Sequence, residues 1–129
     1  MKRRREKAEP RWTIDAYETE GGEAPAWSFI RRLEGRDRVE AIALVKLLEE
    51  QGNLLRRPQS GALGDGLFEL RGKQVRLFYL FLPGRVIVLL GGEIKKRDDI
   101  PAGTLSTMRA LQAKVAGRGA ARRTRGAKR

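Results

Sequence analysis

Two arginines and one glutamate lie close together in the middle of the sequence. Glu69 and Arg71 are separated by one residue, and Arg76 follows five residues later. Arginine presents fixed donors to phosphate oxygens and keeps its charge at any physiological pH, and a carboxylate can accept the proton of a ribose 2′-hydroxyl. These residue types suit phosphodiester cleavage. A cross-strand ion pair between Glu69 and either arginine would explain them equally well.

A second charged group, the KKRDD run of residues 95–99, comes shortly before Pro101. Proline is well tolerated at the first position of a helix, and a helix N-terminus attracts anions. A cationic strand end beside a helix start therefore predicts a phosphate site. The alternative is a solvated turn in which the lysines, arginine and aspartates pair among themselves.

The composition excludes several kinds of chemistry. The chain has 129 residues and contains neither cysteine nor histidine. This absence rules out disulfides, Ser-His-Asp triads, Cys-His dyads and zinc sites built from cysteine or histidine. Acid–base chemistry must then use Glu, Asp, Lys, Tyr or Arg, and we expect no metal and no cofactor. No apolar run approaches the roughly 18 residues that a membrane helix needs, so we expect no membrane span.

The elements that must position the charged residues are three consecutive strands. Strands are predicted over residues 67–71, 75–82 and 85–94, joined by turns so short that neighbouring strands must be antiparallel. Arg71 and Arg76 flank the first turn, so they meet on one face if the register allows, with Glu69 nearby. Side-chain alternation then predicts a carboxylate and two guanidiniums on one sheet face.

The rest of the chain predicts a strand over 11–17, helices over 25–34 and 37–51, a glycine-rich loop over 53–66 and a last helix that begins at 101. The helices show apolar residues at i, i+3, i+4 and i+7. The order is β-α-α-β-β-β-α. This order predicts an α+β fold, with a helical hairpin packed on one face of a small antiparallel or mixed sheet.

The positive charge is concentrated at the two ends of the chain. The sequence has 28 Lys and Arg against 16 Asp and Glu. Residues 1–11 carry six basic and two acidic side chains, and residues 117–129 carry six basic and no acidic ones. We therefore expect one domain over 12–116, flanked by two disordered basic tails. Such tails favour a polyanion, RNA or DNA, as partner; a merely solubilising role is the alternative.

Several motifs in this order resemble the phage-derived Gp49-like/HigB branch of the RelE/ParE toxin superfamily. A glycine precedes Leu-aromatic-Glu-Leu-Arg at 66–71, and Arg-x-aromatic-Tyr follows at 76–79. A hydrophobic strand then ends in Lys95 and Lys96, before Pro101. Each motif alone is loose, but their order and spacing are more specific. The resemblance covers roughly residues 12–115.

The resemblance implies a RelE-like fold and the toxin of a type II toxin–antitoxin pair. Members of this superfamily are typically metal-independent endoribonucleases, that is, hydrolases that cut mRNA, often on the ribosome, and so inhibit translation in the cytoplasm. The implied partners are mRNA, the ribosome and a cognate antitoxin, commonly a helix-turn-helix protein. The RNA backbone is expected to lie across an exposed face of the sheet.

The resemblance also assigns roles to individual residues. Arg71 and Arg76 match basic cleft positions, Lys96 matches a basic position at the end of the last strand, and Glu69 is the candidate general base. Tyr79 matches too, but strand alternation places it opposite Arg76, so we expect it in the core with its hydroxyl bonded. The expected catalytic residues are thus Glu69, Arg71, Arg76 and Lys96, and the expected RNA-binding residues are Lys73, Lys95 and Arg97.

Two departures from the family pattern keep other functions open. The branch usually has a His-Gly-Phe-like stretch before the lysines, where this chain has GGEI at 91–94, and Ala102 stands where relatives often have Tyr or His. Both changes remove candidate acid or base-stacking groups. One alternative is a ParE-like toxin that inhibits a protein such as DNA gyrase. The other is a non-catalytic member of the fold that binds nucleic acid.

Overall fold

The computed structural model describes the backbone of residues 11–127 and the side chains of residues 11–118. One mixed sheet holds five strands in the order β1-β5-β4-β3-β2, with β1 parallel to β5 and the other neighbours antiparallel. The strands are β1 (Thr13–Ala16), β2 (Ser60–Gly64), β3 (Leu67–Arg71), β4 (Val75–Leu82) and β5 (Val86–Ile94). The helices are α2 (Pro25–Arg32), α3 (Gly35–Gln51) and α4 (Ala102–Ala127), with the short 3₁₀ turn η1 (Gly52–Leu54) after α3.

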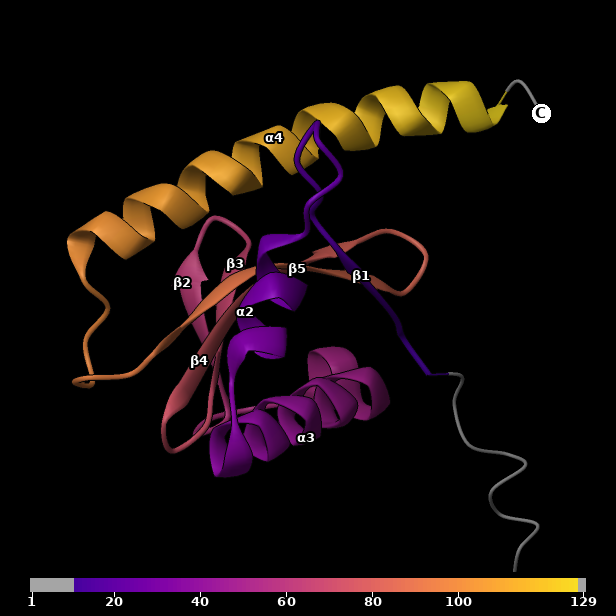
Figure 1. The fold of residues 1–129 in the computed structure, drawn as a ribbon. Helices are drawn as coiled ribbons and strands as arrows, with labels where there is room; N and C mark the ends of the chain where they lie inside the picture. The colour runs from indigo at the N-terminus through magenta and orange to yellow at the C-terminus, as the bar shows by residue number, and fades with distance from the viewer. Residues whose placement is uncertain (1–10, 128–129) are drawn as a thin grey trace, which may run out of the picture.

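Helices cover both faces of the sheet. The predicted hairpin of α2 and α3 packs on one face, where Ile30, Leu48 and Tyr79 belong to the larger core cluster. Helix α4 packs on the opposite face through a second cluster that contains Met108 and Phe78, and Figure 1 shows it on the far side of the sheet from α3. The expectation of an open sheet face for RNA is therefore wrong, because α4 buries apolar side chains against that face.

The predicted strand meander is confirmed in detail. Strands β3 and β4 have the predicted bounds, and their register pairs Arg71 with Arg76 and Glu69 with Phe78. The predicted loop over 53–66, however, contains η1 and the edge strand β2. Strand β2 has the sequence SGALG, whose small residues give no apolar alternation, so the usual strand pattern is missing.

Helix α4 extends further than the sequence predicts. A disordered tail was expected from residue 117, whereas α4 continues to Ala127. Seven of residues 117–127 are alanine or arginine, which are good helix formers, against three glycines, which are poor ones. Arg118 adds contacts to the body, because it donates a hydrogen bond to the Glu18 carbonyl and lies 4.9 Å from the ring centre of Tyr17. The basic residues 1–10 and 128–129 lie outside the described residues.

No helix within residues 11–127 has the length and apolar character needed to cross a membrane.

The β3–β4 turn is held by a carboxylate from α3. Oxygen Oε2 of Glu40 accepts the backbone N–H of Lys73, and Oε1 accepts those of Gln74 and Val75, each at 3.0 Å. Gly72 makes this approach possible, since a Cβ there would stand 2.5 Å from the Glu40 carboxyl carbon. The turn that separates Arg71 from Arg76 is therefore fixed to the helical layer.

Replacing Glu40 with alanine should lower the free energy of unfolding by about 2–3 kcal/mol, because three backbone donors lose a charged acceptor. Urea denaturation of the wild type and the variant measures this loss. Glu34→Ala is the matched control, since Glu34 is exposed and its side chain forms no cap bond to α3. Equal losses in the two variants would show that Glu40 does not anchor the turn.

Candidate functional site

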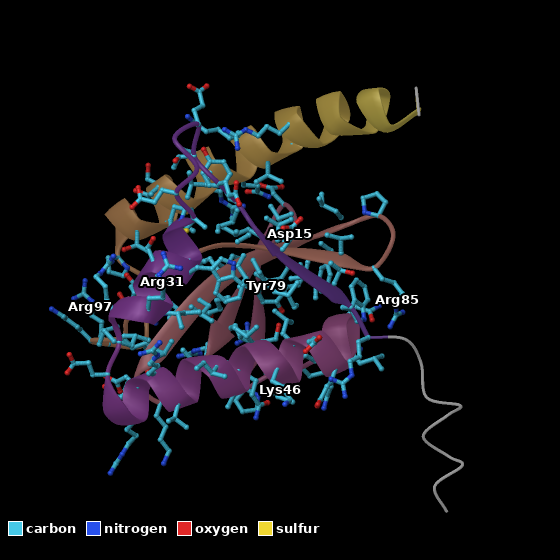
Figure 2. All side chains as sticks on the ribbon, turned by 45° about the vertical axis from the view of Figure 1, so that its right-hand side comes forward. Asp15, Arg31, Lys46, Tyr79, Arg85 and Arg97 are labelled. Carbon is cyan, nitrogen blue, oxygen red and sulfur yellow. The ribbon has the colours of Figure 1, made fainter. Side chains whose placement is uncertain are left out.

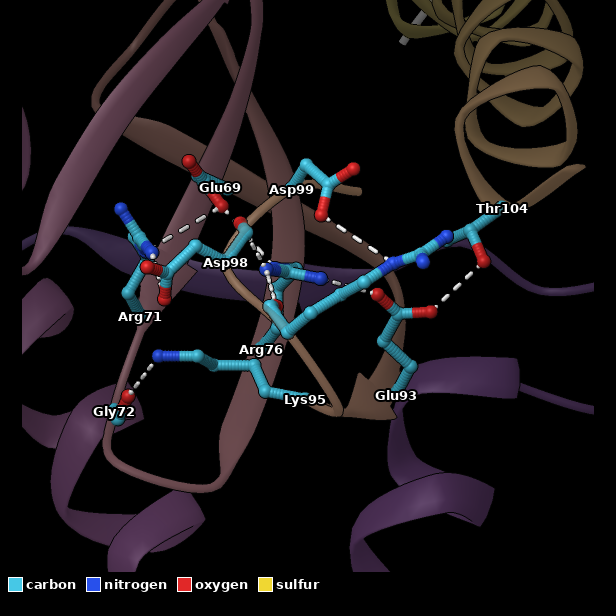
Figure 3. Close-up of polar contacts among 10 residues, drawn as sticks. Glu69, Arg71, Gly72, Arg76, Glu93, Lys95, Asp98, Asp99 and Thr104 are labelled. Atoms are coloured by element: carbon cyan, nitrogen blue, oxygen red, sulfur yellow. Dashed lines mark hydrogen bonds and ion pairs between the residues drawn. The ribbon is translucent and has the colours of Figure 1, made fainter. Parts of the chain in front are cut away.

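The β3–β4 hairpin brings Glu69, Arg71 and Arg76 together, as the sequence predicts. Oxygen Oε1 of Glu69 lies 3.2 Å from Nε of Arg76 and 3.8 Å from Nε of Arg71. The three side chains share the α4-facing side of the sheet because Glu69 and Arg71 are two residues apart on one strand and Arg71 pairs with Arg76 on the next. We refer to these three residues as the Glu69 cluster (Figure 3).

Within this cluster, Arg76 is buried beneath residues 95–101, the segment that connects β5 to α4. Its side chain is 1% exposed. Nη1 donates to Oε2 of Glu93 at 2.6 Å, and Nη2 donates to the carbonyls of Arg97 at 3.1 Å and Asp98 at 2.7 Å. The guanidinium thus binds one carboxylate and two backbone carbonyls while it faces Glu69. This arrangement favours a positioning role for Arg76 over the direct phosphate contact that the sequence suggested.

The solvent side of the cluster is formed by Arg71 and the 95–101 segment. Arg71 is 23% exposed, and its Nη2 lies 3.6 Å from a carboxylate oxygen of Asp98. Lys96 is exposed and forms no ion pair with any described residue. An anion from solvent can therefore reach Arg71 and Lys96, whereas Arg76 is covered.

The three residues expected to bind RNA differ in their contacts. Lys95 donates from Nζ to the carbonyl of Gly72 at 3.0 Å, which ties the 95–101 segment to the β3–β4 turn. Nε of Arg97 lies 3.3 Å from a carboxylate oxygen of Asp99, and both side chains are mostly exposed. Lys73 is exposed on the same turn. Pairing inside the KKRDD run is thus present, as the alternative interpretation of that run required.

A cavity of about 620 Å³ lies where β5 passes into α4. Its lining includes Arg76 and Glu93 from the strands and Lys96, Arg97 and Pro101 from the connecting segment. Three cations and two carboxylates, those of Glu93 and Asp99, border this cavity. Cations beside the start of a helix are a setting in which proteins bind phosphate. This is the place where the sequence predicted a phosphate site.

Comparison with known proteins identifies the family. The model of the family described as "Phage derived protein Gp49-like (DUF891)" matches residues 28–112. The chain belongs to the Gp49-like family. A solved structure, the toxin–antitoxin complex RelBE2 from Mycobacterium tuberculosis, contains a chain that is 22% identical, with a TM-score of 0.43, over 66% of this chain and 99% of that one. No curated protein matches the sequence.

The Gp49-like segment contains the whole Glu69 cluster and also Glu93, whose role the sequence does not indicate because it stands in the GGEI stretch that departs from the family pattern. Besides binding Arg76, Glu93 accepts a hydrogen bond from Thr104 at 2.8 Å, which links β5 to the first turn of α4. At the two positions before Glu93, which are Gly91 and Gly92, close packing leaves no room for a side chain. A Cβ at Gly91 would lie 2.9 Å from Met108, and one at Gly92 would lie 2.6 Å from Phe29.

Tyr79 lies in the core with its hydroxyl bonded, as predicted. It is 1% exposed, and its hydroxyl shares a 2.6 Å hydrogen bond with Ser60. Burial raises the pKa of Tyr79 above the ordinary value of 10.0, and the Ser60 bond lowers it in part. Figure 2 shows Tyr79 inside the Gp49-like fold, while Lys46 and Arg97 point outward. Tyr79 is therefore a neutral core residue at neutral pH.

Among the residues that the structure describes, no group of three or more His, Cys, Asp or Glu side chains is arranged to hold a metal ion.

Proposed function

We propose that this Gp49-like protein is the toxin of a type II toxin–antitoxin pair and cleaves mRNA on the ribosome as a metal-independent endoribonuclease. The observation that carries the proposal is the position of Glu69, whose carboxylate lies 3.2 Å and 3.8 Å from two guanidinium nitrogens. A proton acceptor beside fixed cations is what ribose-assisted phosphodiester cleavage requires. A cognate antitoxin is the partner that this function implies.

In the proposed reaction, the 2′-oxygen of a ribose attacks the adjacent phosphorus while Glu69 accepts the hydroxyl proton. The bond from phosphorus to the 5′-oxygen breaks, giving a 2′,3′-cyclic phosphate and a 5′-hydroxyl. Arg71 binds a non-bridging phosphate oxygen, because its guanidinium is partly exposed beside Glu69. Lys96 donates a proton to the departing 5′-oxygen. The negative charge that develops on the phosphate makes Arg71 the main source of electrostatic stabilisation.

Arg76 has a different part in this proposal. Because its guanidinium is buried, we assign it to the orientation of Glu69 and to the attachment of the 95–101 segment, which carries Lys96. A fixed partner keeps the carboxylate in one rotamer, and preorganised groups of this kind reduce the reorganisation needed during the reaction.

The function is tested by controlled expression in bacteria of the wild type and Arg71→Ala, followed by mapping of RNA 5′ ends. The wild type should produce new 5′-hydroxyl ends within translated frames, and the variant about a hundredfold fewer, the usual cost of losing one charge-stabilising donor. Arg38→Ala, an exposed arginine on α3, should behave as the wild type does. Circular dichroism of each purified protein confirms that it is folded.

Growth arrest without new RNA ends would contradict the ribonuclease proposal and indicate a protein target, as in the ParE-like alternative. Absence of both arrest and ends, with salt-sensitive RNA binding, would indicate a non-catalytic binding protein.

A further inference from the structure

The second carboxylate oxygen of Glu69 faces β2 and an arginine that the proposed mechanism does not use. A Cβ placed on Gly61 would lie 3.2 Å from Oε2 of Glu69 and 3.5 Å from Cζ of Arg57. The Glu69 carboxylate and the Arg57 guanidinium therefore both lie next to Gly61. Arg57 is exposed and forms no ion pair with the described residues. An available cation thus lies next to the proposed general base.

Arg57 also lines a pocket of about 480 Å³ at the edge of the sheet. Three aromatic residues, Phe68, Tyr79 and Phe81, contribute to the pocket. The ring of Phe68 is stacked on Tyr79 at 5.4 Å, and Phe81 is edge-on to both rings. Phe68 and Phe81 are partly exposed. We refer to this cavity as the aromatic pocket.

The edge strand β2 lies between the aromatic pocket, on the α3-facing side of the sheet, and the Glu69 cluster, on the α4-facing side. Strand β2 is the last strand of the sheet, so one of its sides has no neighbouring strand. It contributes only the small residues Ser60, Gly61 and Ala62 to the pocket. Arg57 reaches from the pocket to the α4-facing side, where Glu69 lies. A flexible polyanion can therefore cross this edge with its phosphate near Arg57 and its next group in the pocket.

We propose that the aromatic pocket binds the nucleobase of a nucleotide adjacent to the scissile phosphate, and that Arg57 binds the phosphate of that nucleotide. The proposal rests on the ribonuclease function proposed above. Bases stack on aromatic side chains irrespective of sequence, and guanidinium groups bind phosphate oxygens in a fixed geometry. The aromatic residues of the pocket suit the base of a nucleotide, and Arg57 suits its phosphate. A purely apolar ligand would leave the Arg57 guanidinium without a partner.

The aromatic pocket can be filled without altering the Glu69 cluster. Ala62 pairs with Phe68 across the strands, so its Cβ points to the side of the sheet on which the pocket lies. Ala62 is exposed, and Ala62→Leu should therefore occupy the pocket while the fold is retained. Arg57→Ala removes the phosphate contact, and Arg38→Ala is the matched control for loss of one exposed positive charge.

The test measures binding of two fluorescent probes by anisotropy. One is a 2′-O-methyl hexauridylate, which lacks the 2′-hydroxyl needed for cleavage, and the other is an abasic chain with the same number of phosphates. The wild type should bind the base-containing probe about 10- to 100-fold more tightly, the range expected for stacking of one base. Ala62→Leu should abolish this preference, and Arg57→Ala should weaken binding of both probes, with a smaller salt dependence.

Equal affinity of the wild type for the two probes, or a preference that Ala62→Leu leaves unchanged, would overturn the nucleobase proposal. Either result would mean that the aromatic pocket does not bind a nucleobase. Failure of the ribonuclease function is distinguishable, because the binding preference does not depend on cleavage. A wild type that shows the preference but yields no 5′-hydroxyl ends would retain the nucleobase site and lose the enzymatic activity.

Discussion

Replacement of Arg76 by alanine is expected to lower the free energy of unfolding by about 3–5 kcal/mol, the usual cost of leaving a buried charge without its partner. The variant leaves Glu93, which is 20% exposed, without its ion-pair partner, and it leaves Glu69, which is 9% exposed, with only the more distant Arg71. Two carbonyls of the 95–101 segment also lose their donor. In a domain of this size, thermal denaturation should show a fall in Tm of about 10 °C or more.

Arg97→Ala is the control for Arg76→Ala. Its ion pair with Asp99 is 66% and 76% exposed, so its loss should change stability by about 0.5 kcal/mol or less. A double variant, Arg76→Ala with Glu93→Gln, should recover part of the stability, because the carboxylate that has lost its ion-pair partner is then neutral. If Arg76→Ala were as mild as Arg97→Ala, the buried guanidinium would not be the anchor of this region.

This expected loss of stability decides how activity data should be interpreted. A variant at Arg76 that no longer cleaves RNA would show only that the hairpin and the 95–101 segment need their anchor. Arg71 is the more informative arginine, since it is partly exposed and Glu69 keeps Arg76 as a partner after Arg71 is removed. Arg71 and Arg76 look equivalent in the sequence, but their substitutions test different properties. The Arg76 variant tests stability, and the Arg71 variant tests catalysis.

The faces and register of the β3–β4 hairpin follow from local rules. Period-two alternation and a short turn place Glu69, Arg71 and Arg76 on one face, and the structure confirms this arrangement. The burial of Arg76 does not follow from such rules. It depends on the path of the 95–101 segment and on Glu93 and Thr104, which are distant in sequence from the hairpin.

The position of Arg57 was unpredictable for a related reason. Its approach to Glu69 requires β2 to pair with β3, and the SGALG sequence of β2 carries no strand pattern. Small residues contribute no signal to a hydrophobic pattern. Here the lack of a side chain at Gly61 lets the Glu69 carboxylate and the Arg57 guanidinium approach the same strand. The extension of α4 to Ala127 does not follow from charge either, because the same basic composition that is typical of a disordered tail also contains residues with high helix propensity.

Glu69→Gln is expected to slow RNA cleavage by about 10²- to 10⁴-fold, the usual contribution of a positioned general base. The amide keeps the shape of the side chain but cannot take the proton of the 2′-hydroxyl. The loss should appear in the rate constant of single-turnover cleavage, measured by release of 5′-hydroxyl products from mRNA in a translation mixture. The dependence of this rate constant on the concentration of the protein should change little, because Arg71 and Lys96 still bind phosphate.

Glu34→Gln alters an exposed carboxylate at the start of α3. It controls for the loss of one negative charge and should cleave at the wild-type rate. Glu69→Asp separates the two roles of the carboxylate. It retains the base but is shorter by one methylene, which draws the oxygen away from the guanidiniums, so its rate should lie between those of the wild type and Glu69→Gln. A folded Glu69→Gln variant that cleaves at the wild-type rate would exclude Glu69 as the base, and the carboxylate would then serve only to hold the two arginines in place.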